Sequence, residues 1–119
     1  MSPAALVNEY LSAFYSGDFA TARKFVADDY RFKGPFVEAV NKDQYFASAA
    51  GLASVVKGHK MLQQWEHGAE VCSIYDVCIQ TPTGEGAVTM SEWHTANGGQ
   101  LQSSRLVLDT AIFRALMQR

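Results

Sequence analysis

Apolar residues recur at helical spacing in two stretches near the start of the chain. The first stretch begins at Ser2-Pro3, where a hydroxyl cap precedes a proline, and it ends at Gly17. The second stretch begins at Asp18, keeps its apolar side as far as Val26, and closes at Asp28-Asp29. We therefore expect two adjacent amphipathic helices.

A short extended piece and a third helix follow. Tyr30–Lys33 alternates aromatic and basic residues, as a strand does, and Gly34-Pro35 breaks it. Asn41 is a typical helix cap, and Gln44 three residues later resembles a capping box. The apolar side of this helix fades around Gly51, so we expect the third helix to end there.

From residue 59 onward the pattern changes from helical to extended. It predicts four strands: Met61–Glu66, Glu70–Gln80, Ala87–Thr95 and Leu101–Thr110. The separators at 67–68, 82–84 and 97–99 contain strong turn residues, and links this short join only antiparallel neighbours. The tail Ala111–Leu116 is predicted as a last helical turn that covers an edge.

Three helices followed by a meander of strands predict an α+β fold in a single domain over residues 1–119. The helices are expected to pack on a curved, mainly antiparallel sheet of four to six strands, because both elements bury their apolar sides there. Such a sheet with helices across its concave face encloses a cone. Its open mouth is where a small-molecule site would form.

Composition narrows the classes of partner. The chain is 48% hydrophobic and 18% charged with a net charge of −2, which is typical of a folded domain. No basic block argues for nucleic-acid binding, and no apolar run is long enough for a membrane span. The first residues lack the pattern of a secretory signal, and Cys72 and Cys78 lie too far apart on one predicted strand to form a disulfide. A cytoplasmic location is therefore expected.

Two runs in the first half resemble the opening of the nuclear transport factor 2-like superfamily. They are Tyr10–Phe19, with its Gly-Asp break, and Phe25–Tyr30, with its Asp-Asp exit. Four later segments look like the SnoaL-like branch: Thr81–Glu85, Glu92–His94, Asn97–Leu101 and Arg105–Asp109. The resemblance covers nearly the whole chain and implies the cone-shaped fold. The superfamily contains ketosteroid isomerases, polyketide cyclases, epoxide hydrolases, dehydratases and non-catalytic members, so the resemblance implies no single reaction.

The ketosteroid isomerases of this superfamily allow a comparison by residue. The resemblance places Tyr10 at the position of their oxyanion-donor tyrosine, and Glu92 near the position of their second donor. Their general base, an aspartate before a proline, falls on Gly34 before Pro35. Glycine cannot take a proton, so the resemblance implies that this isomerase mechanism does not operate here.

The register of the last predicted hairpin decides where Glu92 points. Glu92 and His94 share one face of their strand. With a three-residue loop over 97–99, this face adjoins Leu106 and lines the cone as part of a mostly apolar pocket. With a two-residue loop, Glu92 lies opposite Arg105 in an ordinary cross-strand ion pair.

The candidate site follows from the first register. Glu92 or His94 is expected as the base, and Tyr10 or Tyr30 as the hydroxyl that holds developing negative charge. The expected ligand-binding side chains face the gap between helices and sheet: Phe14, Tyr30, Phe32, Trp65, Met90, Leu106 and Leu108. The histidines lack the spacing of a zinc site, and there is no phosphate loop or dinucleotide fingerprint, so neither a metal nor a cofactor is expected. The structural alternative is an exposed His94 and tyrosines that are simply packed.

Two functions are compatible with these patterns. The first is a cofactor-independent protein that binds a small apolar or aromatic metabolite and transforms it by proton transfer, as in isomerisation, cyclisation or dehydration. The second is a non-catalytic binding or dimerisation module of the same fold. A homodimer through the outer sheet face is expected for either function. With the three-residue loop, Trp93 faces away from the cone among Ser91, Val107 and Arg105, and tryptophan and arginine are enriched at interfaces.

Overall fold

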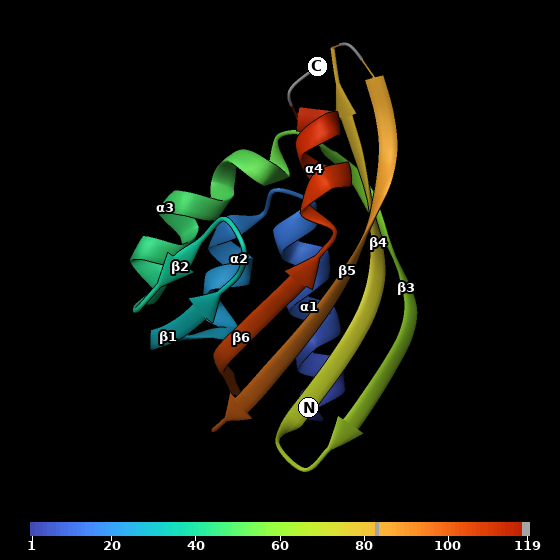
Figure 1. Ribbon diagram of the computed structural model, residues 1–119. Coiled ribbons are helices and arrows are strands. Elements are labelled where there is room, and N and C mark those ends of the chain that lie inside the picture. The colour runs from blue at the N-terminus through green and yellow to red at the C-terminus, as the bar shows by residue number, and fades with distance from the viewer. Residues whose placement is uncertain (83, 118–119) are drawn as a thin grey trace.

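The computed structural model describes residues 1–82 and 84–117, and Figure 1 shows its ribbon. The helices are α1 (Pro3–Tyr15), α2 (Phe19–Lys24), α3 (Lys42–Ala53) and α4 (Thr110–Met117). The strands are β1 (Val26–Lys33), β2 (Glu38–Ala39), β3 (Val56–His67), β4 (Glu70–Thr81), β5 (Gly84–Asn97) and β6 (Gln100–Leu108). The predicted turn at 82–84 includes Thr83, which lies outside the described residues.

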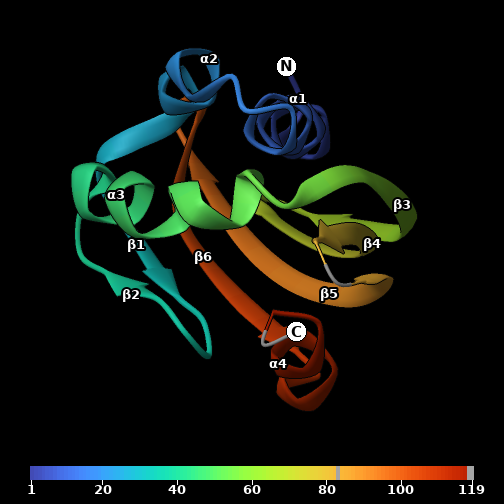
Figure 2. The ribbon, with the colours of Figure 1, turned by 90° about the horizontal axis from the view of Figure 1, so that it is seen from above.

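The strands form one six-stranded sheet in the order β2-β1-β6-β5-β4-β3. Neighbours are antiparallel except β1 and β6, which pair in parallel. The predicted meander is confirmed as β3 to β6, and the sheet curves around α3 (Figure 2). The extended piece predicted at Tyr30–Lys33 is confirmed as part of β1, but the description of three helices followed by the strands is wrong, because β1 and β2 lie between α2 and α3 and belong to the sheet. The tail is also a full helix, α4, rather than a single turn.

The second helix is shorter than its sequence pattern predicts. It ends at Lys24, and the next residues enter β1, where Val26 is fully buried and pairs with Leu101 of β6. Pairing with a strand far along the chain outweighs the local helical spacing, and a β-branched residue such as valine suits the strand. The aspartates at 28 and 29 therefore belong to β1 and do not close a helix.

The helix starts are where the sequence places them. The Ser2 hydroxyl accepts a hydrogen bond from the Ala5 amide, and the Asn41 side chain accepts one from the Gln44 amide. The Gln44 side chain in turn accepts from the Val40 amide, one residue before the cap, so the capping box is formed in a shifted version. α3 continues two residues past Gly51 before it ends.

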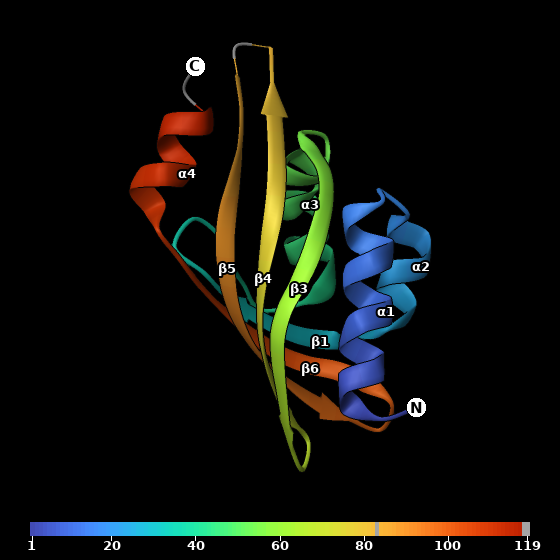
Figure 3. The ribbon, with the colours of Figure 1, turned by 90° about the vertical axis from the view of Figure 1, so that its right-hand side faces the viewer.

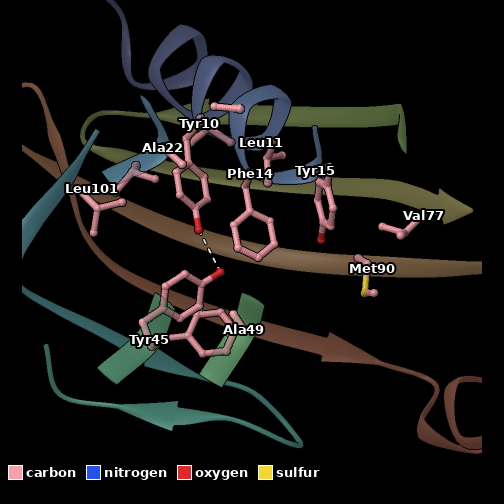
Figure 4. Packing of buried hydrophobic residues seen from close by; sticks show 14 of the residues in the cluster. Tyr10, Leu11, Phe14, Tyr15, Ala22, Tyr45, Ala49, Val77, Met90 and Leu101 are labelled. Atoms are coloured by element: carbon pink, nitrogen blue, oxygen red, sulfur yellow. Dashed lines mark hydrogen bonds between the residues drawn. The ribbon is translucent and has the colours of Figure 1, made fainter. Parts of the chain in front are cut away.

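The core lies between the inner face of the sheet and the first three helices, with α1, α2 and α3 on one side of the sheet and α4 set apart beside β5 (Figure 3). Its largest fully buried side chains include Tyr10, Tyr30, Tyr75, Leu11, Ile79 and Met90. Aromatic residues of α1 point from the helix toward Tyr45 of α3 and toward β5 (Figure 4). Among the described residues, no helix is long and apolar enough to cross a membrane.

The hairpin that joins β5 and β6 has a two-residue loop. Asn97 pairs with Gln100, and the loop glycines Gly98 and Gly99 have φ angles of 62° and 81°. Both angles lie in the left-handed region that glycine adopts without steric cost. The three-residue loop considered from the sequence is therefore wrong.

A β-bulge at Gln102 corrects the register that this loop would impose. The pairing shifts by one residue between Ala96 and Thr95, which leaves Gln102 as the extra residue on β6. As a result Glu92 lies opposite Leu106, and Arg105 lies opposite Trp93. Glu92 therefore has the neighbour that the three-residue loop would give it. The two-residue loop and the bulge at Gln102 together produce this register.

Candidate functional site

A cavity of about 290 Å³ opens between the inner face of the sheet, α3, α4 and the segment that joins β1 to β2. Six aromatic side chains line it: Phe14, Tyr15, Phe32, Phe36, Tyr45 and Phe113. Glu92 is the only charged side chain among the described residues of its wall. The described residues contain no group of three His, Cys, Asp or Glu side chains placed to hold a metal ion. The cavity is therefore an apolar, aromatic chamber that contains a single acid.

At one end of the cavity two rings stack across the gap between different segments. Phe36, from the segment between β1 and β2, lies 4.9 Å from Phe113 of α4 between ring centroids, at an interplanar angle of 27°. The Arg114 guanidinium lies 5.3 Å from the centroid of the Phe36 ring. On the other side of α4, Leu116 packs against Gly86 of β5, where a Cβ would come within 2.8 Å of it. These contacts hold α4 against the cavity.

Most of the side chains that the sequence assigns to ligand binding do line this cavity. They are Phe14, Phe32, Met90, Leu106 and Leu108. Trp65 does not. A bulge at Leu62 shifts the pairing of β3 with β4, so Trp65 lies opposite Cys72 on the outer face and is 52% exposed. Without the bulge, Trp65 would lie opposite the buried Val71.

Tyr30 is fully buried but does not line the cavity wall. Its ring packs edge-on against Tyr45 at 5.2 Å, and its hydroxyl has no hydrogen-bond partner among the described residues. Ser104 is nonetheless near enough to lower the pKa of Tyr30, against the larger effects of burial and the Glu92 charge, which raise it. The role of Tyr30 as a donor to a ligand is therefore not supported by its position.

Glu92 is held from behind by tyrosine hydroxyls. The Tyr75 hydroxyl donates to Glu92 Oε1 at 2.8 Å, and the Tyr15 hydroxyl lies 3.1 Å from that of Tyr75. A phenol has one proton to donate, and Tyr75 gives its own to Glu92, so Tyr15 is the donor to Tyr75. Glu92 Oε2 has no hydrogen bond to any described residue.

His94 lies behind Glu92 and is completely buried, so the alternative of an exposed histidine is wrong. Its Nδ1 is 2.5 Å from the Ser104 hydroxyl. Its Nε2 is 3.1 Å from Glu92 Oε1, an ion-pair distance, although the N–H direction does not satisfy a hydrogen bond. His94 is absent from the described wall of the cavity, whereas Glu92 is part of it.

Tyr10 is also displaced from its expected role. It is fully buried beneath the wall, and its hydroxyl donates to the Tyr45 hydroxyl at 2.8 Å (Figure 4). Tyr45, on α3, is the member of this pair that lines the cavity. By its spacing along the chain, Tyr45 is indistinguishable from the apolar residues on the inner side of the third helix. Tyrosine at an inward helical position was the available signal, because a buried hydroxyl needs a partner.

Burial raises the pKa of every tyrosine in the chain, and the negative charge of Glu92 contributes to the increase in each case. These phenols therefore keep their protons at neutral pH. They can donate hydrogen bonds within the core and into the cavity, and the acid is the group among them that carries negative charge.

Gly34 lines the cavity where the family resemblance places a general base. A Cβ at this position would lie 2.9 Å from Cε1 of the Phe32 ring, so the ring occupies the space that a side chain would need. The acid of this cavity instead comes from β5, which β6 separates from β1 in the sheet.

The fold recurs in solved structures. One is a nuclear transport factor 2-like protein of unknown function from Cytophaga hutchinsonii, with 21% identity over 95% of both chains and a TM-score of 0.78. Another, from Burkholderia pseudomallei, has 16% identity over the whole of both chains and a TM-score of 0.85. TerC, co-crystallised with polyporic acid, has 13% identity over 98% of both chains and a TM-score of 0.84.

No family model and no curated protein matches the sequence. At these levels of identity the structural likeness establishes the fold alone. The chain has the nuclear transport factor 2-like fold that its sequence motifs resemble.

Proposed function

We propose that this chain binds a small apolar or aromatic molecule in its cavity and that Glu92 moves a proton of that molecule. The observation that carries the proposal is the position of one acid in an otherwise uncharged aromatic wall. Its Oε1 is engaged by Tyr75, and its Oε2 has no partner among the described residues. A fixed acid in an apolar chamber is suited to general acid–base catalysis.

The simplest reaction is proton transfer next to a carbonyl. Glu92 Oε2 takes a proton from the carbon beside the carbonyl, and the electron pair of that C–H bond forms a new carbon–carbon double bond. The carbonyl pair moves to oxygen and gives an enolate. The protonated Glu92 then returns the proton to another atom of the ligand. The sequence of steps needs no oxidant or reductant, and isomerisation, cyclisation and dehydration all begin in this way.

His94 and Tyr75 act as positioning residues in this proposal. Tyr75 fixes one carboxylate oxygen by a direct hydrogen bond, and His94 lies at 3.1 Å from the same oxygen. A carboxylate whose rotation is restrained presents its second oxygen in one direction, which lowers the cost of reaching the reactive geometry.

The test uses 2-tetralone, which joins a carbonyl and activated C–H bonds to a two-ring apolar body. The chain has four methionines, of which Met90 and Met117 line the cavity whereas Met1 and Met61 do not. With ¹³C-methyl methionine, we expect 2-tetralone to shift the Met90 and Met117 signals and to leave the Met1 signal in place. In D₂O, we expect the wild-type chain to accelerate deuterium exchange beside the carbonyl, and Glu92→Gln to bind without accelerating it.

A non-catalytic ligand carrier is the second candidate, and Gly34 favours it. The position that the family resemblance assigns to a base has neither an acid nor room for one. If 2-tetralone shifts Met90 and Met117 while exchange proceeds at the rate seen in buffer, the chain binds ligands without turnover. If no methionine signal moves, ligand binding in the cavity is itself contradicted.

We further propose that the chain forms a homodimer through the outer face of the sheet. Trp93 is 49% exposed there, opposite Arg105. Basic residues gather on β1 and β6, where Arg31, Lys33 and Arg105 line a shared groove beside Trp93. An acidic residue, Glu70, lies on β4 at the other side of Trp93 and accepts a hydrogen bond from its indole. A twofold axis through this face would bring the basic side of one copy against the acidic side of the other.

A further inference from the structure

The hydroxyl protons of the core can be assigned one by one, because each phenol donates a single hydrogen bond. Tyr75 donates to Glu92, and Tyr15 donates to Tyr75. Tyr10 donates to Tyr45. The proton of Tyr45 itself has no acceptor among the described residues, although its oxygen is already engaged as an acceptor.

Tyr45 is also the tyrosine of the cavity wall whose hydroxyl proton is uncommitted among the described residues. Tyr30 has a free hydroxyl proton too, but it does not line the wall. Tyr15 lines the wall, but its proton is used by Tyr75. Ser48, another hydroxyl on the wall, is exposed and therefore hydrated. A buried, pre-positioned donor is consequently available at Tyr45 alone among the described residues of the wall.

The Tyr45 ring is fixed from several sides. Its centroid lies 4.7 Å from that of Phe32, 5.1 Å from Phe46 and 5.9 Å from Phe14. The hydroxyl points across the core to Tyr10 on the facing helix (Figure 4). A ring that is packed on its edges and faces needs no rearrangement when a ligand arrives, which is the condition under which a hydrogen-bond donor is most effective.

Resting on the proposed function, we propose that Tyr45 is the catalytic hydroxyl that donates a hydrogen bond to the ligand's carbonyl oxygen while Glu92 takes the proton beside that carbonyl. As the C–H electron pair moves into the ring system, negative charge collects on the oxygen, and the Tyr45 proton stabilises it without leaving Tyr45. The wall has no cationic side chain among the described residues, so it suits a neutral ketone and disfavours a carboxylate or phosphate.

The raised pKa of Tyr45 agrees with this role. Burial is the main cause, followed by the neighbouring Tyr30 and by the Glu92 charge. The proton therefore stays on Tyr45 at neutral pH.

The test compares Tyr45→Phe with Tyr10→Phe. Both variants lose the hydrogen bond between these two hydroxyls, but only the first removes the donor from the cavity. With 2-tetralone, we expect Tyr45→Phe to bind about tenfold more weakly, which is the effect of one well-placed hydrogen bond, and Tyr10→Phe to bind within about twofold of wild type. The hydrocarbon tetralin, which has no carbonyl, should bind both variants and the wild type equally.

Three outcomes separate this inference from the function on which it rests. If neither probe shifts the Met90 and Met117 signals of the wild type, the proposed function fails. If both probes bind but Tyr45→Phe retains wild-type affinity for 2-tetralone, or if Tyr10→Phe loses as much, the role of Tyr45 is overturned and ligand binding stands. If Tyr45→Phe folds poorly, the double variant Tyr10→Phe, Tyr45→Phe replaces it, because that variant removes both hydroxyls and leaves neither one unpaired. We expect the double variant to lose the same affinity for 2-tetralone.

Discussion

Tyr75 of β4 donates a 2.8 Å hydrogen bond to Glu92 of β5 inside the core. The pair is diagonal across the two strands, because Tyr75 itself lies opposite Met90. Tyr75 is also the acceptor for Tyr15, so one phenol joins the acid of the cavity wall to helix α1. A chain of hydrogen bonds of this kind is costly to break in the middle, because both of its neighbours then lose a partner.

Replacing Tyr75 with phenylalanine is expected to lower the free energy of unfolding by about 1–3 kcal/mol, since it leaves a buried carboxylate oxygen and a buried hydroxyl without partners. Tyr15→Phe is the matched control, because Tyr75 can still donate to Glu92 in its absence. We expect this control to lose about 1 kcal/mol or less. Urea unfolding monitored by circular dichroism gives both values. Equal losses in the two variants would contradict the order of donors assigned here.

Two glycine-to-alanine substitutions should change stability in opposite directions. A Cβ on Gly34 would lie 2.9 Å from the Phe32 ring, so Gly34→Ala must displace a packed aromatic side chain, at a cost of about 1–3 kcal/mol. A Cβ on Gly51, in helix α3, meets no atom within 4 Å, so Gly51→Ala should stabilise the fold by about 0.5–1 kcal/mol. Thermal unfolding of both variants provides the measurement. A neutral Gly34→Ala would show that Phe32 does not fill the missing base position.

Alkaline pH is expected to unfold the chain in one cooperative step. All five tyrosines have pKa values raised by burial in the folded state. The folded state therefore holds these protons more tightly than the unfolded chain does. The resulting stabilisation is fully present below the ordinary tyrosine pKa of about 10, and it is lost as the pH rises toward the folded values.

The phenolate absorbance in the ultraviolet follows this transition directly. We expect no tyrosinate signal while circular dichroism still reports the native fold, and then simultaneous ionisation of the tyrosines as the fold is lost. A tyrosine that titrates near pH 10 in the folded chain would mean that at least one hydroxyl is more open to water than the structure shows.

The homodimer proposal predicts a mass twice the 13.1 kDa of the chain in sedimentation experiments at micromolar concentration. Arg105→Glu should shift the chain toward monomer, because it reverses a charge beside Trp93 at the centre of the proposed interface. Lys24→Glu makes the same charge change at an exposed position of α2 and serves as the control. A wild-type monomer, or an equal response to both substitutions, counts against an interface on this face.

Much of the fold can be predicted because its signals are local. The helix start at Ser2 and the cap at Asn41 depend on side chains that bond to amides three residues away. The four strands of the meander are separated by short segments that contain residues typical of turns. By contrast, the helical spacing around Val26 does not reveal that this residue pairs in parallel with Leu101, a partner far along the chain.

The candidate site was only partly predictable, because strand faces depend on bulges. Alternation along a strand correctly groups Glu92 with Met90, but one extra residue at Leu62 turns Trp65 from the inner face to the outer one. Tyr45 was missed because a tyrosine on the inward side of a helix has the same spacing as an apolar core residue. Its role depends on which hydroxyl donates to which, and the sequence contains no record of that.

The bulge at Gln102 interrupts the pairing of β5 with β6, and it also decides which residue lies opposite Glu92 in the cavity wall. If Gln102 were paired with Thr95 in a ladder without the bulge, and the two-residue loop were kept, Arg105 would take the place of Leu106 opposite Glu92. The guanidinium would then share the inner face with the acid and neutralise it in an ion pair. A more regular ladder would therefore leave the chamber without a free acid, so the irregular strand is the one that suits a reactive site.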